Sequence, residues 1–403
     1  MLFTDYLQDM RAIWTSIFLK KRNPVVKKYY LAVLLMVLPV TAYADAPPMP
    51  SMAGPLVARA APYSFNTTPF GKVYVTGALT GLVFDQSSPA TGDKSDLADI
   101  SNGQIFVQNT MGPVQFFVQS GAYSTPALGT AYLRADKTVD KTYGFIPQGF
   151  VKFVPSDKFS IEAGKLPTLF GAEYTFTFEN MNIERGLLWN QENAVNRGVQ
   201  TNYTTGPLAL SLAWSDGFYS GHYNWLSGSA AYTIDKDSSV SFEAGGNLGE
   251  TAHTSFTTPL AQNNSSIYNV IYTYTAGAWT FNPYFQYTYV PENAPIGINH
   301  AASTYGAALL AKYAIEGNFT IAGRAECIGS TGSAANGAPN LLYGQGSKAW
   351  SFTVTPTYQQ GRFFGRVEAS YVKATDTTVG SAFGSTGNDA SQGRLLFESG
   401  VLF

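Results

Sequence analysis

The feature that most constrains the fold is a hydrophobic pattern of period two that recurs along most of the chain. From Gly71 onward, apolar and polar residues alternate in about sixteen separate stretches, the period of a β-strand with one apolar and one polar face. We find no helical pattern in the same region. The chain is therefore predicted to be all-β.

The predicted strands have similar lengths. Most of them reach the roughly nine to eleven residues that a tilted membrane-spanning strand needs. They lie near residues 71–84, 102–110, 113–124, 143–154, 158–166, 195–204, 207–216, 226–234, 238–248, 266–275, 278–290, 302–314, 317–328, 347–359, 362–374 and 392–403.

The connections between these stretches are alternately short and long. In each short one, Gly or Asp supplies the conformation or the hydrogen bond that a hairpin needs. The short connections are Met111-Gly112, Pro155-Ser156-Asp157, Thr205-Gly206, Asp235-Lys236-Asp237, Ala276-Gly277, Glu316-Gly317 and Gln360-Gly361. An outer-membrane barrel has short periplasmic turns and long external loops, whereas a soluble sandwich has no reason for this asymmetry. We predict an antiparallel transmembrane β-barrel of about sixteen strands, with fourteen and eighteen as alternatives.

Composition agrees with a barrel and excludes several other classes. Charged residues make up 13% of the chain, about half of the roughly 25% usual in soluble proteins. One cysteine rules out an internal disulfide framework, and the three histidines fall in separate loop-like stretches. No basic stripe indicates nucleic-acid binding. We therefore expect no metal, cofactor, catalytic residue or nucleic-acid partner.

The N-terminus has the pattern of an export signal. A basic Lys27-Lys28 pair precedes the apolar run from Leu31 to Val40, and Ala42-Tyr43-Ala44 is a cleavage sequence. The apolar run is too short to span a membrane as a helix. We predict that residues 1–44 are removed by a cut after Ala44, with translation starting downstream of Met1. Residues 45–70 would be a flexible periplasmic lead or a plug, and residues 71–403 the barrel.

The alternation also assigns a face to each strand residue. Arg324 and Glu326 oppose Phe319, Ile321 and Cys327, and a charged side chain at mid-depth in lipid costs about 2–4 kcal/mol. The charged face must therefore line the lumen, and Cys327 should face lipid. The residues predicted to line the lumen are Lys152, Glu162, Glu243, Lys312, Arg324, Glu326, Arg366, Glu368, Arg394 and Glu398. They would form either a ladder of ion pairs or a charge-balanced wall.

Two motif blocks carry a family resemblance. The first is Gly164-Lys165-Leu166-Pro167-Thr168, followed by Phe170-Gly171-Ala172-Glu173 and by Asn180 and Asn182. The second runs from Gly198 to Tyr203 and continues at Ser215-Asp216-Gly217. Together they resemble the OmpL-like family of β-barrel porins, which implies a pore-forming protein of the bacterial outer membrane. Asn196-Arg197 departs from the pattern, where a His or Thr is expected before the glycine.

The longest interruption between strands is loop 167–194. It is the third long connection, and in general porins the third loop folds inward to narrow the channel. By this analogy we expect a constriction formed by Glu173, Glu179, Glu184, Arg185, Glu192 and Arg197. The alternative is that these charges are solvated or pair locally, for example Glu184 with Arg197. We expect Leu187 and Leu188, with neighbouring aromatic residues, to anchor the loop to the wall; stacking on a saccharide is the alternative.

The sequence thus predicts a porin through which small hydrophilic solutes or ions diffuse passively. Its other partners would be outer-membrane lipid and the barrel-assembly machinery, because the last strand ends in Phe403 as in outer-membrane barrels. Trimers are common among porins of this size, which makes a homotrimer an expected assembly. A plugged structural or adhesin-like barrel is one alternative. An outer-membrane enzyme is another, although no Ser/His or Asp/His constellation supports it.

Overall fold

A computed structural model of the protein describes Leu56, residues 62–68 and residues 70–403. The predicted signal peptide and its cut after Ala44 lie outside these residues.

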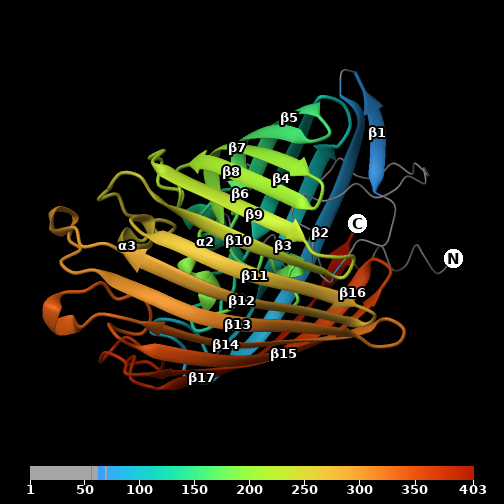
Figure 1. The fold of residues 1–403 in the computed structure, drawn as a ribbon. Helices are drawn as coiled ribbons and strands as arrows, with labels where there is room; N and C mark the ends of the chain where they lie inside the picture. Colours follow the sequence, from blue (N-terminus) through green and yellow to red (C-terminus); the bar gives the residue numbers. More distant parts are fainter. Residues whose placement is uncertain (1–55, 57–61, 69) are drawn as a thin grey trace, which may run out of the picture. The chain divides into compact units, whose positions relative to one another are not determined.

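Sixteen strands, β2 to β17, form a closed antiparallel barrel (Figure 1). Each strand pairs with the next along the chain, and β17 pairs with β2 to close the sheet. The predicted sixteen-stranded antiparallel barrel is therefore confirmed. The strands are β2 Gly71–Gln86, β3 Asp96–Asn109, β4 Val114–Tyr123, β5 Gln148–Ser156, β6 Phe159–Pro167, β7 Val195–Thr205, β8 Leu208–Ser215, β9 Trp225–Thr233, β10 Ser238–Asn247, β11 Ser266–Ala276, β12 Trp279–Val290, β13 Ala302–Ala314, β14 Phe319–Ser330, β15 Lys348–Gln360, β16 Phe363–Thr375 and β17 Ser391–Leu402.

The predicted turns connect the strands at one end of the barrel, and the long loops connect them at the other. Gly277 and Gly361 lie in two of these turns and both have φ of +59°. This left-handed conformation is strained for a residue with a Cβ atom, so glycine makes the tight reversal possible. We call the end with the long loops the external end.

One strand and two α-helices of the described residues were not expected from the sequence. β1, Tyr63–Thr67, lies within the expected N-terminal lead and pairs with the start of β2. The long loop between β4 and β5 contains helix α2, Ala135–Lys141, which packs on β3 and β4. A shorter helix, α3, spans Leu260–Asn263 in the loop after β10. No helix of the described residues is long and apolar enough to cross a membrane.

The side chains of the strands alternate between an apolar outer face and a polar inner face. In β16, Phe363 and Val367 are exposed, whereas Arg366 and Glu368 are almost completely buried. Cys327 lies on the exposed outer face of β14. Burying charge on the inner face and exposing apolar groups outward is the reverse of a soluble protein and suits a surface surrounded by lipid.

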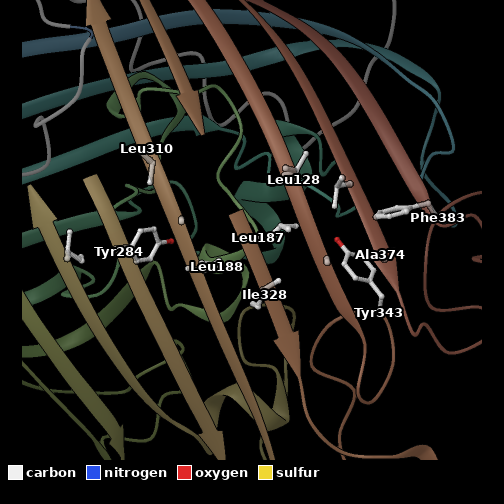
Figure 2. Close-up of a cluster of buried hydrophobic side chains, with 13 residues drawn as sticks. Leu128, Leu187, Leu188, Tyr284, Leu310, Ile328, Tyr343, Ala374 and Phe383 are labelled. Atoms are coloured by element: carbon white, nitrogen blue, oxygen red, sulfur yellow. The ribbon is translucent and has the colours of Figure 1, made fainter. Parts of the chain in front are cut away.

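Inside the barrel, apolar side chains of loop residues pack against the wall. Leu187 and Leu188 contact a cluster that includes Tyr284 on β12 and Ile328 on β14 (Figure 2). They therefore anchor the loop between β6 and β7, as expected. A second cluster places Phe178 of the same loop against β3 and β4. Its other buried members are Leu56, Ala78, Phe106, Phe117, Tyr123, Phe150, Leu166, Phe176, Phe364 and Leu402.

Candidate functional site

Residues 168–194, which we call the inner loop, connect β6 to β7 and lie against opposite sides of the lumen. Near its start, the backbone N–H of Gly171 donates to Glu243 on β10, at 2.9 Å. Further along, the hydroxyl of Thr177 donates to Glu398 on β17, at 2.6 Å. Since β10 and β17 are separated by six strands in one direction and eight in the other, the inner loop crosses the barrel.

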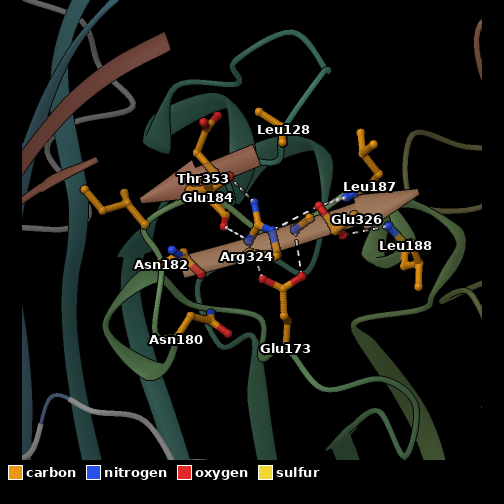
Figure 3. A network of polar contacts seen from close by, with 12 residues as sticks. Leu128, Glu173, Asn180, Asn182, Glu184, Leu187, Leu188, Arg324, Glu326 and Thr353 are labelled. Carbon is orange, nitrogen blue, oxygen red and sulfur yellow. Dashed lines mark hydrogen bonds and ion pairs between the residues drawn. The ribbon is translucent and has the colours of Figure 1, made fainter. Parts of the chain in front are cut away.

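Arg324 on β14 is the central contact between the inner loop and the wall (Figure 3). Its Nη1 donates to Glu173 Oε1 at 2.7 Å and to the carbonyl oxygen of Glu184 at 2.6 Å. Its Nε donates to Glu326 Oε2 at 3.0 Å. Because the guanidinium group is planar, one side chain can bind a loop carboxylate, a loop carbonyl and a wall carboxylate at the same time.

Two wall glutamates bind the backbone of the inner loop rather than its side chains. Glu326 accepts hydrogen bonds from the N–H groups of Leu187 and Leu188, the first at 3.1 Å. Glu368 accepts from the N–H groups of Ile183 and Glu184, the second at 3.0 Å. Buried N–H groups need acceptors, so these carboxylates satisfy loop donors that the irregular backbone leaves unpaired.

Arg366 and Arg394 extend the same network along the wall. The Nε of Arg366 donates to Glu398 at 2.8 Å, and its Nη2 donates to the carbonyl oxygen of Thr177 at 2.7 Å. Arg394 pairs with Glu184 at 2.5 Å. The alternative pairing of Glu184 with Arg197 is therefore wrong. The wall charges form neither a simple ladder nor an independent wall, since most of them also hold the inner loop.

The structure removes Arg197 from the expected set of constriction residues. It lies on β7 with the outward parity of the exposed residues Val199 and Tyr203, and it pairs with Asp216 at 2.7 Å. The inner loop ends before this residue, since Val195 already belongs to β7. Arg197 therefore contributes to the outer rim of the barrel and not to the lumen.

The remaining predicted wall residues lie on the inner face, farther from the loop. Lys152 on β5 pairs with Glu162 on β6 at 3.0 Å. Both line a cavity of about 480 Å³ whose other polar residues are Gln108, Asn109, Thr110, Gln115, Thr168, Gln200 and Asn202. Lys312 is half-buried on β13. This side of the lumen, along β3 to β7, holds polar space that the inner loop leaves unfilled.

A second cavity, of about 220 Å³, lies against the inner loop itself. Glu173, Glu179 and Glu243 contribute to its lining, and it shares Pro167, Thr168 and Leu169 with the larger cavity. The backbone N–H of Phe176 donates to the carboxylate of Glu179 at 3.0 Å. The described residues that line this cavity include no lysine or arginine. Its lining therefore contributes carboxyl groups and no basic side chain, while Arg324 pairs with Glu173 beside it.

Burial changes the ionisation of two loop groups. Burial raises the pKa of Glu192 well above its usual value, and the nearby carboxylate of Glu173 raises it further. Burial lowers the pKa of Arg185 to about 10, against the opposing effect of Glu173 and Glu184. Arg185 stays protonated at neutral pH and lies over the ring of Trp189 at 5.0 Å. A proton can therefore occupy Glu192 at pH values where an ordinary glutamate has lost it.

Sequence reasoning missed the part that the loop after β4 plays in the site. The N–H of Leu128 donates to the carbonyl oxygen of Arg185 at 2.8 Å, and the N–H of Arg185 donates to Pro126 at 3.1 Å. Arg394 also donates to the carbonyl oxygen of Ala127, at 3.1 Å. In each of these contacts the loop after β4 contributes only backbone atoms, which leave no pattern of side-chain types in the sequence.

Comparison with known families decides the identity of the chain. A family model described as "Putative beta-barrel porin-2, OmpL-like" matches residues 72–403. The chain belongs to this porin family. It is an outer-membrane porin, as the sequence predicts, and the match includes all sixteen barrel strands except Gly71, the first residue of β2. A search of curated proteins found no match to the porin.

Solved structures show the same fold at low sequence identity. OmpT of Vibrio cholerae is 12% identical, with a TM-score of 0.57 over 84% of this porin and 99% of its own chain. The channel DcaP of Acinetobacter baumannii is 11% identical, with a TM-score of 0.55 and the same coverages. OmpF of Salmonella typhi is 12% identical, with a TM-score of 0.54 over 85% of the porin and 100% of its chain. The described residues contain no group of His, Cys, Asp or Glu suited to a metal ion.

Proposed function

We propose that the inner loop narrows the lumen and that small hydrophilic solutes diffuse passively past it along β3 to β7. The observation that carries this proposal is the pair of polar cavities that share Pro167, Thr168 and Leu169. Along β14, β16 and β17, by contrast, Arg324, Arg366 and Arg394 bind the inner loop directly to the wall. Solutes would therefore follow the side where polar side chains border open space.

The charge of the lumen favours cations over anions. Among the described residues, the inner loop and the wall bury eight glutamates and four arginines. These are Glu173, Glu179, Glu184, Glu192, Glu243, Glu326, Glu368 and Glu398 with Arg185, Arg324, Arg366 and Arg394. The glutamates still outnumber the arginines when Glu192, whose pKa is raised by burial, is left out. Fixed charge of one sign beside a narrow pore attracts the opposite ion. The cavity against the inner loop, lined by Glu173, Glu179 and Glu243, is where this selection would act.

A plugged barrel is the second candidate, and one observation favours it. Leu56, which precedes the barrel, is fully buried in the same apolar cluster as Phe178 of the inner loop. In that case Leu56 would help to close the lumen. In both cases the protein would act without catalysis.

We also propose export with a cut after Ala44, which would give a mature N-terminus at Asp45, and assembly as a homotrimer.

The test is the conductance of the refolded mature chain in a planar bilayer, with the reversal potential under a salt gradient. A constricted pore gives stable steps and a cation-selective potential, and deleting residues 174–190 enlarges the steps. Deleting exposed residues 253–256 of the loop after β10 is the matched control and should leave the steps unchanged. Steps of unchanged size after removal of the inner loop would refute the constriction. Conductance that appears only after residues 45–62 are removed would establish the plugged barrel.

A further inference from the structure

A groove of about 580 Å³ lies on the outer face of the barrel, at the external ends of β5 to β8. Val199 on β7 and Trp214 on β8 form part of it, and both are exposed with the lipid-facing parity. The groove is therefore open to the membrane and not to the lumen. Its other lining residues are Ile146, Gly149, Gly164, Lys165, Arg197, Gly198 and Tyr223.

The floor of the groove lacks a side chain at one lipid-facing position, Gly149. Gly164 on β6 and Gly198 on β7 are directly paired, and Gly149 on β5 pairs with Lys165. Paired residues of adjacent strands share a face, so Gly149 has the lipid-facing parity of Lys165, whereas Gly164 and Gly198 have the opposite parity and line the groove with backbone atoms only. Trp214 and Tyr223 stand beside this floor, with their rings 6.0 Å apart.

Two cations lie at the groove on neighbouring strands. Lys165 and Arg197 are cross-strand partners on the same face, an arrangement of like charges that destabilises a sheet. Asp216 neutralises Arg197 at 2.7 Å. The ammonium group of Lys165 donates to two neutral acceptors, the carbonyl oxygens of Tyr143 and Ile146, at 3.0 and 2.9 Å. Among the described residues, Lys165 has no carboxylate partner, so one positive charge remains at the groove.

The ring of Tyr219 supports both cations. The guanidinium group of Arg197 lies 4.0 Å from the ring centre, and the ammonium group of Lys165 lies 5.4 Å from it. Tyr219 has a φ of +59°, which is unfavourable for a bulky residue. Such a conformation persists only where the surroundings impose it. The surrounding fold thus holds two like charges together at the lipid-facing rim.

We propose that this groove binds a lipid of the external leaflet that carries a phosphate on its headgroup. The phosphate lies at Lys165 and Arg197, and an acyl chain lies over Val199 and Trp214. Asp216 neutralises only Arg197, and a phosphate would neutralise the remaining charge of Lys165. Ammonium and guanidinium groups are the usual protein partners of phosphate. At Gly149, which carries no side chain, an acyl chain can approach the backbone closely.

Native mass spectrometry of the full mature barrel in detergent tests the proposal. The probes are dioleoyl phosphatidic acid and dioleoyl glycerol, which differ only in the phosphate. Lys165→Gln removes the unbalanced charge. Gly149→Leu fills the floor, and an added Cβ there meets only Ile146 and Phe117 at 3.4 and 3.7 Å, which are ordinary contacts. Lys137→Gln, in the exposed part of α2, is the matched control because it removes a lysine outside the groove.

We expect the wild type to bind phosphatidic acid more tightly than the glycerol lipid. Lys165→Gln should weaken phosphatidic acid binding about fivefold, the usual contribution of one basic residue near an anionic headgroup. Gly149→Leu should weaken the binding of both lipids, and Lys137→Gln should change neither. Equal binding of the two lipids by the wild type would overturn the proposal. So would wild-type affinity in both groove variants, or dissociation of a trimer by Gly149→Leu, which would make the groove a contact between copies of the chain.

Discussion

Replacing Arg324 with methionine should destabilise the folded porin, because the substitution leaves two buried carboxylates without their cation. Arg324 lies 2.7 Å from Glu173 and 3.0 Å from Glu326, and the side chains of all three are at most 1% exposed. At an effective dielectric constant of about 20, a pair of charges 2.7 Å apart attracts by about 6 kcal/mol, which is an upper limit. Desolvation offsets part of this, and removing one partner of a buried pair costs about 3–5 kcal/mol. We expect Arg324→Met to lower the free energy of unfolding by that amount.

A double-mutant cycle with Glu173→Gln isolates the contact between loop and wall. Glu173→Gln alone should cost about 1 kcal/mol, because a neutral amide still accepts a hydrogen bond from Arg324. In the double variant, only Glu326 remains as a buried carboxylate without its cation, so part of the lost unfolding free energy should be recovered. We expect a coupling energy of about 2 kcal/mol, within the range for residues in direct contact. The assay is urea unfolding in phospholipid vesicles, followed by tryptophan fluorescence.

Arg362→Met is the matched control for this cycle. Arg362 lies outside the strands, in the turn between β15 and β16, and contacts the ring of Tyr63 at 5.8 Å. Its replacement should change the free energy of unfolding by no more than about 0.5 kcal/mol. Additive effects of Glu173→Gln and Arg324→Met, within about 0.5 kcal/mol, would show that the ion pair does not hold the inner loop.

Three further changes have defined outcomes. Burial raises the pKa of Glu192, so the stability that its protonated carboxyl group contributes is complete below the unfolded pKa of about 4.3 and is lost as pH rises through the native pKa. Glu192→Gln should therefore be more stable than the wild type at neutral pH and equally stable near pH 4. A difference in unfolding free energy that stays constant over several pH values would contradict this. An added Cβ at Gly186 would lie 2.0 Å from Glu326 Oε1, so Gly186→Ala should displace that carboxylate and lower the free energy of unfolding by about 1–3 kcal/mol. The displaced loop should also enlarge the conductance steps, and an unchanged conductance would argue against loop displacement. Cys327 faces outward. We expect it to resist an impermeant charged maleimide in vesicles but to react with a lipid-soluble one. Rapid labelling by the charged reagent would count against its placement in lipid.

The strands could be predicted from the sequence because a half-buried strand carries its own signal. Each barrel strand has an apolar and a polar face, so period two fixes both its position and its orientation. The inner face of Arg366 and Glu368 follows from the same alternation. α2 was missed because Ala135–Lys141 is only seven residues long and most of it is polar, which leaves almost no apolar periodicity to detect.

The partners within the lumen could not be predicted, because they depend on which strands face each other across the barrel. Glu184 and Arg394 are 210 residues apart, and no local pattern connects them. Arg197 was placed in the constriction because it lies close to the loop in sequence, although one residue of strand register decides whether a side chain points to lipid or lumen. The hydrogen bonds from the backbone N–H groups of Leu187 and Ile183 could not be predicted either, because every residue except proline has such a group and the sequence does not show which ones meet a wall carboxylate.

The position of the inner loop in the chain determines when it can become ordered. The loop leaves β6, yet most of its wall contacts come from β14, β16 and β17, the last part of the chain. A chain that has formed only its first strands lacks these acceptors, so the loop should stay accessible until the barrel closes. Trypsin cleavage after Arg185, which is completely buried in the closed barrel, reports this step during refolding. We expect protection of Arg185 to develop together with the pairing of β17 and β2, and protection that precedes closure would show that the loop orders independently of the last strands.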